Sequence, residues 1–226
     1  RIQHLHEKEW SKKPKDPNQP SLNGFLFTHF PFYFTPFSMS RNVAIFLFDE
    51  VEVLDFAGPY EVFSVTGLRT FTEKPFNVYT IAEKSPVVAR NGLTIIPDFL
   101  LDDCPTPDIF LIPGGGGYDA DGKPFGSRRE MHNQVVLEWV KKQALQAELV
   151  LSVCTGALIL GQAGLLEGLQ ATTHFKALDS LRDISTAIEV VENVRYVDNG
   201  KVILSAGVSA GIDMSYYVVS QLLGKD

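Results

Sequence analysis

Short apolar runs alternate with segments of helical character along most of this chain. Four runs rich in apolar residues are Val43–Phe48, Phe76–Ala82, Ile109–Ile112 and Leu149–Val153. Runs of this length are typical of strands buried on both faces of a parallel sheet. The segments between and after them predict helices over Gly58–Val65, Glu130–Ala147, Thr155–Ala163, Phe175–Leu181 and Gly211–Leu223. This alternation indicates an α/β fold with a mostly parallel central sheet.

Two turn signals predict antiparallel pairs beside this sheet. Val87–Ala89 and Leu93–Ile96 flank an Asn-Gly dipeptide, which is a strong hairpin signal. Val190–Val197 and Lys201–Ser205 flank a second signal of the same kind, Asp198–Gly200. We therefore expect two antiparallel excursions in an otherwise parallel arrangement.

Cys154 stands where an apolar run ends and a small-residue helical segment begins, in the sequence AELVLSVCTG. This pattern predicts a nucleophile elbow, a sharp strand-to-helix turn that exposes one side chain at the edge of the sheet. Backbone N–H groups that open the helix can lower the pKa of a thiol there and keep it nucleophilic. The alternative is that Cys154 is a small buried hydrophobe without chemistry.

His174 follows Cys154 by twenty residues, after the helical stretch Gly156–Leu166 and a turn. We expect the chain to return there to the same sheet edge, so that thiol and imidazole form a nucleophile and base pair. A satisfied surface histidine is the alternative reading.

Asp55 belongs to a loop with four carboxylates that follows the first predicted strand. Its neighbours Leu54 and Phe56 predict partial burial, which raises the pKa of a carboxyl and lets it hold or donate a proton. Asp55 could instead be the N-cap of the helix Gly58–Val65.

A glycine loop, Gly114–Gly117, follows the strand Ile109–Ile112. It lacks the spacing of a nucleotide-binding loop, and no Lys-Ser or Lys-Thr follows. Glycines let backbone N–H groups approach a reacting group closely, which suits an oxyanion hole. A loop without function remains the alternative.

The chain resembles the ThiJ/PfpI superfamily, and within it the isonitrile hydratase branch, from about Arg41 to Leu223. The motifs that carry the resemblance are Leu54–Pro59, Ile112–Gly115, Ser152–Gly156, Gly161–Leu166, Ala171–His174 and Ser209–Asp213. The resemblance implies a flavodoxin-like α/β/α sandwich, usually a homodimer, with the elbow cysteine as nucleophile. It further implies that Asp55 is the acidic partner of Cys154 and that His174 lies beside the thiol. Gly114, Gly115 and Thr155 would then supply substrate-binding and oxyanion contacts.

The function that the resemblance implies is a cysteine-dependent hydro-lyase that converts a small isonitrile to an N-substituted formamide. A glyoxalase-like or peptidase-like member of the superfamily is one alternative, and the motif Leu54–Pro59 weakens it modestly, because it has Asp where those and chaperone-like members have Glu. The main alternative is a noncatalytic ligand-sensing domain, as in AraC-type regulators. Many of those sensor domains lack the cysteine, so Cys154 favours the enzyme.

Composition bounds the remaining possibilities. The chain has 226 residues, 45% of them hydrophobic, enough for one core without disulfides, and we expect no cofactor or metal. A net charge of −7 and the lack of a helix-turn-helix argue against nucleic-acid binding. We expect Cys104 and Cys154 to be reduced in a cytoplasmic protein, with no membrane span.

We divide the chain into an N-terminal extension, residues 1–40, and a ThiJ/PfpI-like domain, residues 41–226. Removing Arg1–Ser38 is expected to leave fold and activity intact. Members of the hydratase branch continue past the last helix, so a further C-terminal segment would complete the packing.

Overall fold

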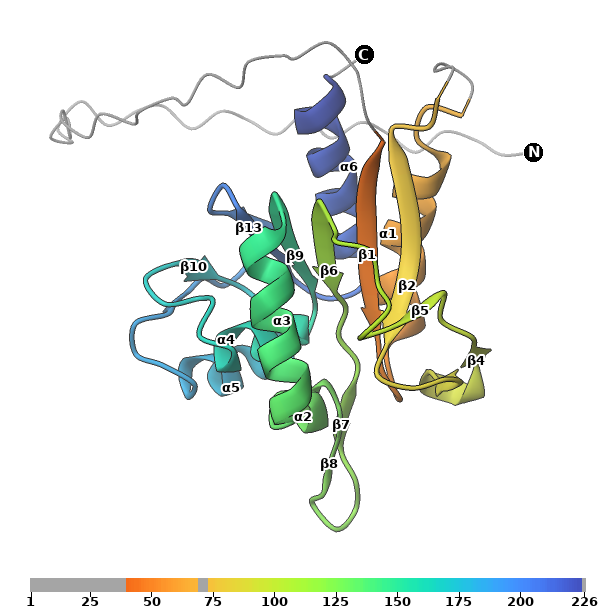
Figure 1. Cartoon of the computed structure of the whole chain (residues 1–226). Coiled ribbons are helices and arrows are strands. Elements are labelled where there is room, and N and C mark those ends of the chain that lie inside the picture. The colour runs from red at the N-terminus through yellow and green to blue at the C-terminus, as the bar shows by residue number, and fades with distance from the viewer. Residues whose placement is uncertain (1–39, 69–72, 225–226) are drawn as a thin grey trace, which may run out of the picture. The chain divides into compact units, whose positions relative to one another are not determined.

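The structure of this chain is a computed structural model that describes residues 40–68 and 73–224 (Figure 1). The expected extension over residues 1–40 lies outside the described residues, except for Ser40.

The described residues form a seven-stranded central sheet in the order β12-β13-β9-β6-β1-β2-β5. The strands are β1 (Arg41–Leu47), β2 (Phe76–Ala82), β5 (Phe99–Leu100), β6 (Ile109–Ile112), β9 (Leu149–Val153), β12 (Tyr196–Asp198) and β13 (Val202–Ser205). All neighbouring strands are parallel except β12 and β13. The four apolar runs of the sequence occupy four adjacent positions, β9, β6, β1 and β2, which confirms them as the buried strands of the sheet.

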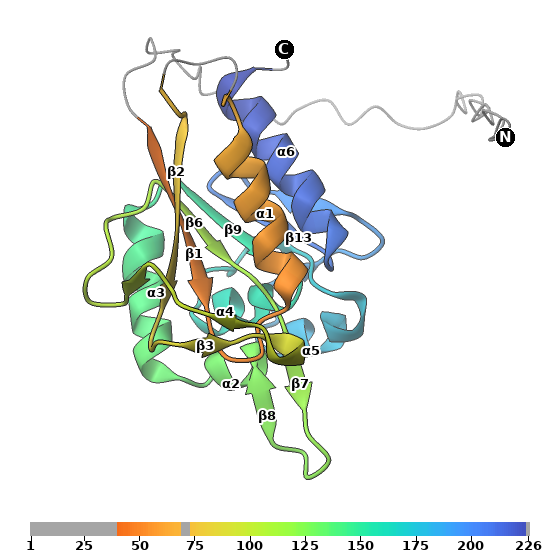
Figure 2. The same ribbon diagram turned by 90° about the vertical axis from the view of Figure 1, so that its right-hand side faces the viewer.

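Helices cover both faces of the sheet, as Figure 2 shows from the side. They are α1 (Val53–Val65), α2 (Ser127–Glu130), α3 (Gln134–Gln146), α4 (Gly156–Gln162), α5 (Leu178–Arg182) and α6 (Ser209–Leu223). Helices α1 and α6 pack together on one face, while α3 and α4 lie on the other. The predicted α/β/α sandwich is therefore confirmed.

Three predicted helices differ from the structure. The predicted helix Phe175–Leu181 is a 3-10 turn over Phe175–Ala177 followed by α5. Helix α1 begins at Val53 rather than Gly58, and it includes Pro59 in its interior. The earlier start buries Phe56 against the core, a gain that outweighs the poor helix propensity of the Gly-Pro pair. The predicted helix Glu130–Ala147 begins only at Gln134, as α3, because the side chain of Asn133 caps it by accepting from the N–H of Val136 at 3.4 Å, and Glu130 ends the preceding α2.

The antiparallel predictions are confirmed in part. The first pair is β3 (Val87–Val88) with β4 (Thr94–Ile95), and the second is β12 with β13. The predicted strand Val190–Val197 is too long, because its first residue belongs to β11 (Glu189–Val190), which pairs with β10 (Gln170–Ala171). The glycine loop continues into an unpredicted hairpin, β7 (Gly116–Tyr118) with β8 (Pro124–Gly126).

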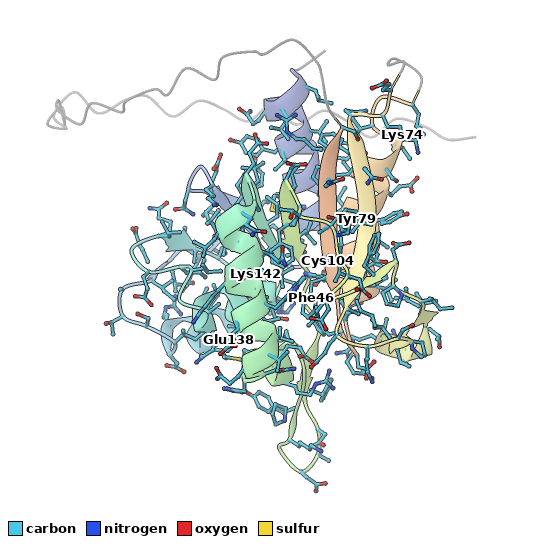
Figure 3. All side chains as sticks on the ribbon, viewed as in Figure 1. Phe46, Lys74, Tyr79, Cys104, Glu138 and Lys142 are labelled. Atoms are coloured by element: carbon cyan, nitrogen blue, oxygen red, sulfur yellow. The ribbon has the colours of Figure 1, made fainter. Side chains whose placement is uncertain are left out.

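Trp139 anchors α3 to the sheet. Its ring lies 5.5 Å from that of Phe46 and 5.3 Å from that of Phe110, measured between centroids. Its indole N–H donates to the carbonyl of Leu101 at 3.0 Å, so the buried polar atom is satisfied. Figure 3 labels Phe46 beside α3, on the side of the helix where β1 lies.

Gly156 allows the start of α4 to approach the end of β6. A Cβ atom at this position would lie 2.1 Å from the carbonyl oxygen of Ile112, far inside van der Waals contact. This close approach brings the residue after the elbow against the strand that leads into the glycine loop.

We predict that Gly156→Ala lowers the free energy of unfolding by at least ~3 kcal/mol, because a backbone carbonyl cannot move away from the new methyl group. Gly117→Ala is the matched control, since a Cβ there would meet only the Phe125 ring at 3.4 Å. Urea unfolding of both variants measures the difference. Equal midpoints for the two variants would show that the approach of α4 to β6 is not tight.

Candidate active site

Cys154 occupies the predicted sharp turn between β9 and α4. Its φ is +56°, in the left-handed region that non-glycine residues rarely adopt. Its N–H donates to the carbonyls of Ser205 at 3.2 Å and Ala206 at 3.0 Å, which fixes the turn against the end of β13. The residue is 7% exposed, so its thiol lies in a largely water-free setting.

The side chain of Asp55 lies fully buried beside the Cys154 thiol. Its Oδ2 accepts from the N–H of Gly114 at 3.2 Å, and the thiol and the N–H of Val208 also face the carboxyl. Within the described residues, Oδ1 has no hydrogen-bond partner of regular geometry. Asp55 belongs to the first turn of α1 and does not cap it, because the N-cap is Glu52. The N-cap alternative is therefore wrong, and the predicted burial is confirmed.

Burial raises the pKa of Asp55 from 3.8 to about 7. The hydrogen bond from Cys154 opposes this rise, the charge of Glu52 adds to it, and the N–H groups of Gly114 and Val208 oppose it. Loss of hydration is the dominant cause, because a buried carboxylate gives up its favourable contact with water. Near neutral pH this carboxyl is therefore poised to give or take a proton.

Burial, together with the nearby Asp55 carboxylate, raises the pKa of the Cys154 thiol above its ordinary value. The N–H and hydroxyl of Thr155 act in the opposite direction but do not prevail. The N–H at the start of α4 therefore lowers this pKa as expected, but the net pKa is raised, because burial and the Asp55 carboxylate outweigh that effect. Asp55 and Cys154 titrate as a coupled pair rather than as independent groups.

The glycine loop holds Asp55 and the residue after Cys154 in place through hydrogen bonds from its N–H groups. The N–H of Gly115 donates to Thr155 Oγ1 at 3.0 Å, and that oxygen also accepts from Ser127 Oγ at 2.8 Å. Gly115 has a φ of +128°, and a Cβ there would lie 2.4 Å from the carbonyl oxygen of Glu50. The N–H groups of Gly114 and Gly115 thus already have partners in Asp55 and Thr155. The oxyanion role expected for them remains a prediction.

His174 lies near the pair without a hydrogen bond to Cys154 in the described part of the chain. Its Nδ1 accepts from the N–H of Lys176 at 3.3 Å, so the proton of the neutral ring is on Nε2. Burial, followed by the charges of Lys176 and Arg128, lowers the pKa of His174 and keeps the ring neutral. The neighbouring residue, Thr173, makes the direct link, because its hydroxyl donates to the Cys154 carbonyl at 2.7 Å.

A cavity of about 280 Å³ is lined by residues that neighbour the pair. It is lined by Thr172, Thr173, His174, Phe175, Leu178, Glu192, Asn193, Val194, Ala206, Gly207 and Val208. Thr173 contacts Cys154, and Val208 faces Asp55, so the cavity shares two residues with the immediate surroundings of the pair. A small ligand in this cavity would therefore contact immediate neighbours of the pair.

The segment from Ser205 to Val208 is the part of the site that sequence reasoning missed. It holds the Cys154 N–H, faces Asp55 and packs Gly207 against the His174 ring. Val208 has a φ of +48°, an uncommon value for a β-branched residue. The recognised motif Ser209–Asp213 begins one residue later, and this adjacency is the signal that could have drawn attention to the segment.

Cys104 belongs to another region, on the side of the sheet covered by α3. It lies near Tyr79 and Lys142 in Figure 3, and Gln143 Nε2 donates to its sulfur at 3.9 Å. Both cysteines are free thiols.

Among the described residues, no group of three or more His, Cys, Asp and Glu side chains could hold a metal ion. None of the described helices combines the length and apolar character that a membrane crossing requires.

Comparison with known proteins agrees with this fold. The DJ-1/PfpI family matches residues 41–221. Isonitrile hydratase of Pseudomonas putida is 35% identical over 188 residues, which are 83% of this chain and 75% of that protein. The transcriptional regulator CdhR of Pseudomonas aeruginosa is 27% identical over 143 residues, or 63% of this chain and 39% of the regulator.

Comparison with solved structures also finds proteins of this family. The crystal structure of a ThiJ/PfpI family protein from Pseudomonas syringae has a TM-score of 0.69 and 27% identity, and the match covers 89% of this chain and 76% of that one. An α/β sandwich with a cysteine on a nucleophile elbow is the class that fold and site define. The chain belongs to the DJ-1/PfpI family.

We predict that Asp55 makes the free energy of unfolding depend on pH between about 4 and 7. Its pKa is about 7 in the folded protein and near 3.8 when exposed, so the folded state retains a proton that the unfolded state releases. Stability is therefore highest below the lower value and falls as pH rises through the upper one, by ~2–4 kcal/mol.

Asp55→Asn should remove most of this dependence, because the amide does not ionise, and it should be the more stable protein at pH 8. Urea unfolding at several pH values measures the effect. Exposed Asp121→Asn is the control and should behave as the wild type. A wild-type stability that does not fall over this interval would contradict the raised pKa.

Proposed function

We propose that this protein hydrates small isonitriles, R–N≡C, to N-substituted formamides, R–NH–CHO. The observation that carries the proposal is the buried Asp55 carboxyl that faces the elbow thiol of Cys154. The likeness to isonitrile hydratase of Pseudomonas putida supports the same reaction. By resemblance to its relatives, we propose a cytoplasmic homodimer that needs no cofactor.

The protonation of the pair suits this reaction. Below about pH 7 both groups carry a proton, and above it the pair has lost one proton in total. The remaining proton is shared between sulfur and carboxyl, which gives access to a thiolate beside a protonated Asp55. A nucleophile and an acid are then present together, although the pKa of the isolated thiol is high.

The first half of the reaction joins sulfur to the substrate. The Cys154 sulfur attacks the terminal isonitrile carbon, and the shared proton passes from Asp55 to that carbon. The product is a thioimidate, Cys–S–CH=N–R, with Asp55 left as a carboxylate.

The second half adds water. The Asp55 carboxylate accepts a proton from water as the hydroxyl adds to the thioimidate carbon, and it passes that proton to the nitrogen. The carbon–sulfur bond then breaks as the new hydroxyl gives its proton to Asp55, which releases R–NH–CHO and restores the pair. Neutral His174 at the cavity wall would orient the water, and the N–H groups of Gly115 and Thr155 would stabilise charge that develops on the adduct once they exchange their present partners.

A ligand-sensing domain without catalysis is the second candidate. Two observations favour it, the raised pKa of the Cys154 thiol and the likeness to the regulator CdhR. In that case the cavity beside the pair would bind a metabolite and leave it unchanged.

We predict that the protein converts cyclohexyl isocyanide to N-cyclohexylformamide and that Cys154→Ala abolishes this turnover. Asp55→Asn should reduce kcat/KM by ~10²-fold or more, because a positioned proton donor typically contributes this much. Formamide appearance measured by liquid chromatography tests both variants. Cys104→Ala is the matched control and should retain full activity. A fully active Cys154→Ala protein would disprove the nucleophile assignment, and a wild type that binds but does not convert isonitriles would favour the sensor.

We predict that kcat/KM rises with pH to a plateau with a midpoint near 7, because the active form of the pair appears when its first proton is lost. Asp55→Asn should lose this limb, because the thiol alone titrates at higher pH. Residual activity of the variant would instead increase steadily into the alkaline range. A wild-type profile that falls on passing from pH 6 to pH 8 would contradict the proton sharing.

A further inference from the structure

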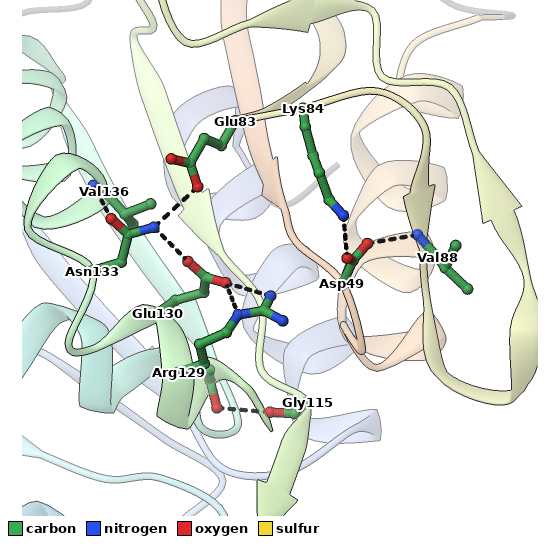
Figure 4. Close-up of polar contacts among 10 residues, drawn as sticks. Asp49, Glu83, Lys84, Val88, Gly115, Arg129, Glu130, Asn133 and Val136 are labelled. Carbon is green, nitrogen blue, oxygen red and sulfur yellow. Dashed lines mark hydrogen bonds and ion pairs between the residues drawn. The ribbon is translucent and has the colours of Figure 1, made fainter. Parts of the chain in front are cut away.

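Two ion pairs connect the loop after β1 that carries Asp49, Glu50 and Glu52, here called the carboxylate loop, to the segment between β2 and β4. In the first, Lys84 Nζ lies 2.5 Å from Asp49 Oδ2, and Asp49 also accepts from the N–H of Val88 (Figure 4). In the second, Arg90 Nε lies 3.7 Å from Glu52 Oε2. Both pairs are partly exposed, but they differ in what their carboxylates face.

The second pair leads directly to the buried site. The N–H of Glu52 donates to the carbonyl of Gly114 at 2.9 Å, and the N–H of Gly114 donates to Asp55. The negative charge of Glu52 raises the pKa of Asp55, and the guanidinium of Arg90 lies against that same carboxylate. Arg90 also donates from Nη1 to the carbonyl of Gly116 at 3.3 Å, on the same glycine loop.

The backbone of Arg90 strengthens this connection. Its N–H donates to the carbonyl of Val51 at 3.0 Å, and Val51 forms an isolated bridge with Gly115. The turn that carries Arg90 therefore contacts both segments that flank Asp55, the carboxylate loop and the glycine loop.

We propose that Arg90 is a positioning residue that sets the pH at which the Asp55–Cys154 pair becomes reactive, by neutralising Glu52 and holding the glycine loop. The inference rests on the pair acting as in the proposed function, but its effect is visible in the chemistry of the thiol alone.

Glu52 is the group near Asp55 through which Arg90 can act on the carboxyl. The titratable groups that face it are Cys154 from the elbow and Glu52 at the start of α1, while Gly114 and Val208 contribute backbone N–H groups. His174 lies on the cavity wall and stays neutral, and the charges of Lys176 and Arg128 act on that ring. Of the two ion pairs, Arg90 with Glu52 is the one whose carboxylate acts on Asp55.

The test is the rate of Cys154 alkylation by iodoacetamide as a function of pH, followed by mass spectrometry in a Cys104→Ala background. The midpoint of the wild-type profile is expected near 7. Arg90→Gln should move it up by ~0.5 pH unit, because the uncompensated charge of Glu52 favours the protonated carboxyl. Glu52→Gln should move it down, and Arg90→Lys should restore most of the wild-type midpoint.

Lys84→Gln is the matched control, because it breaks the neighbouring ion pair without touching Glu52, and its midpoint should equal that of the wild type. In the Glu52→Gln background, Arg90→Gln should have little further effect. An unchanged midpoint in Arg90→Gln would overturn the proposal, as would an equal shift in Lys84→Gln. If Arg90→Gln fails to fold, the direction of the Glu52→Gln shift and the Arg90→Lys profile decide the matter. The measurement uses no isonitrile, so an inactive hydratase does not affect its outcome.

Discussion

The contact between the buried carboxyl of Asp55 and the thiol of Cys154 determines what the rest of this site can do. Burial raises the pKa of both groups, the Asp55 carboxylate raises that of the thiol further, and the hydrogen bond from the thiol lowers that of Asp55. A second charge on the pair is therefore strongly disfavoured, because two anions cannot share a dry pocket. One mobile proton near neutral pH follows from this constraint, and it provides a nucleophile and an acid in the same small volume.

The fold serves mainly to keep these two side chains together. Asp55 comes from α1 on one face of the sheet, and Cys154 stands at the end of β9, where α4 begins on the other face. The glycine loop connects them, since the N–H of Gly114 binds the carboxyl and that of Gly115 binds Thr155, the residue after the cysteine. Glycine is needed at 115 and 156 because backbone atoms occupy the space where a Cβ would lie. The end of β13 closes the site by holding the Cys154 N–H.

Much of this arrangement could be predicted from sequence because it depends on local patterns. The apolar runs located the four central strands, the Asn-Gly signals located both hairpins, and the strand-to-helix transition located the elbow. The direction of the Cys154 pKa could not be predicted, because it depends on a carboxyl 99 positions earlier in the sequence and on the depth of burial. The same holds for Val208 and Arg90, whose importance arises from contacts between segments far apart in the chain. A β-branched residue with positive φ has no local signature at all.

The central claim is that Asp55 retains its proton up to neutral pH because it is buried against Cys154. Infrared difference spectroscopy tests this most directly, by following the stretch of the protonated carboxyl in the wild-type protein minus Asp55→Asn from pH 4 to pH 9. The account predicts a band that disappears with a midpoint near 7. A band that is already lost near pH 4, where an exposed aspartate titrates, would contradict it.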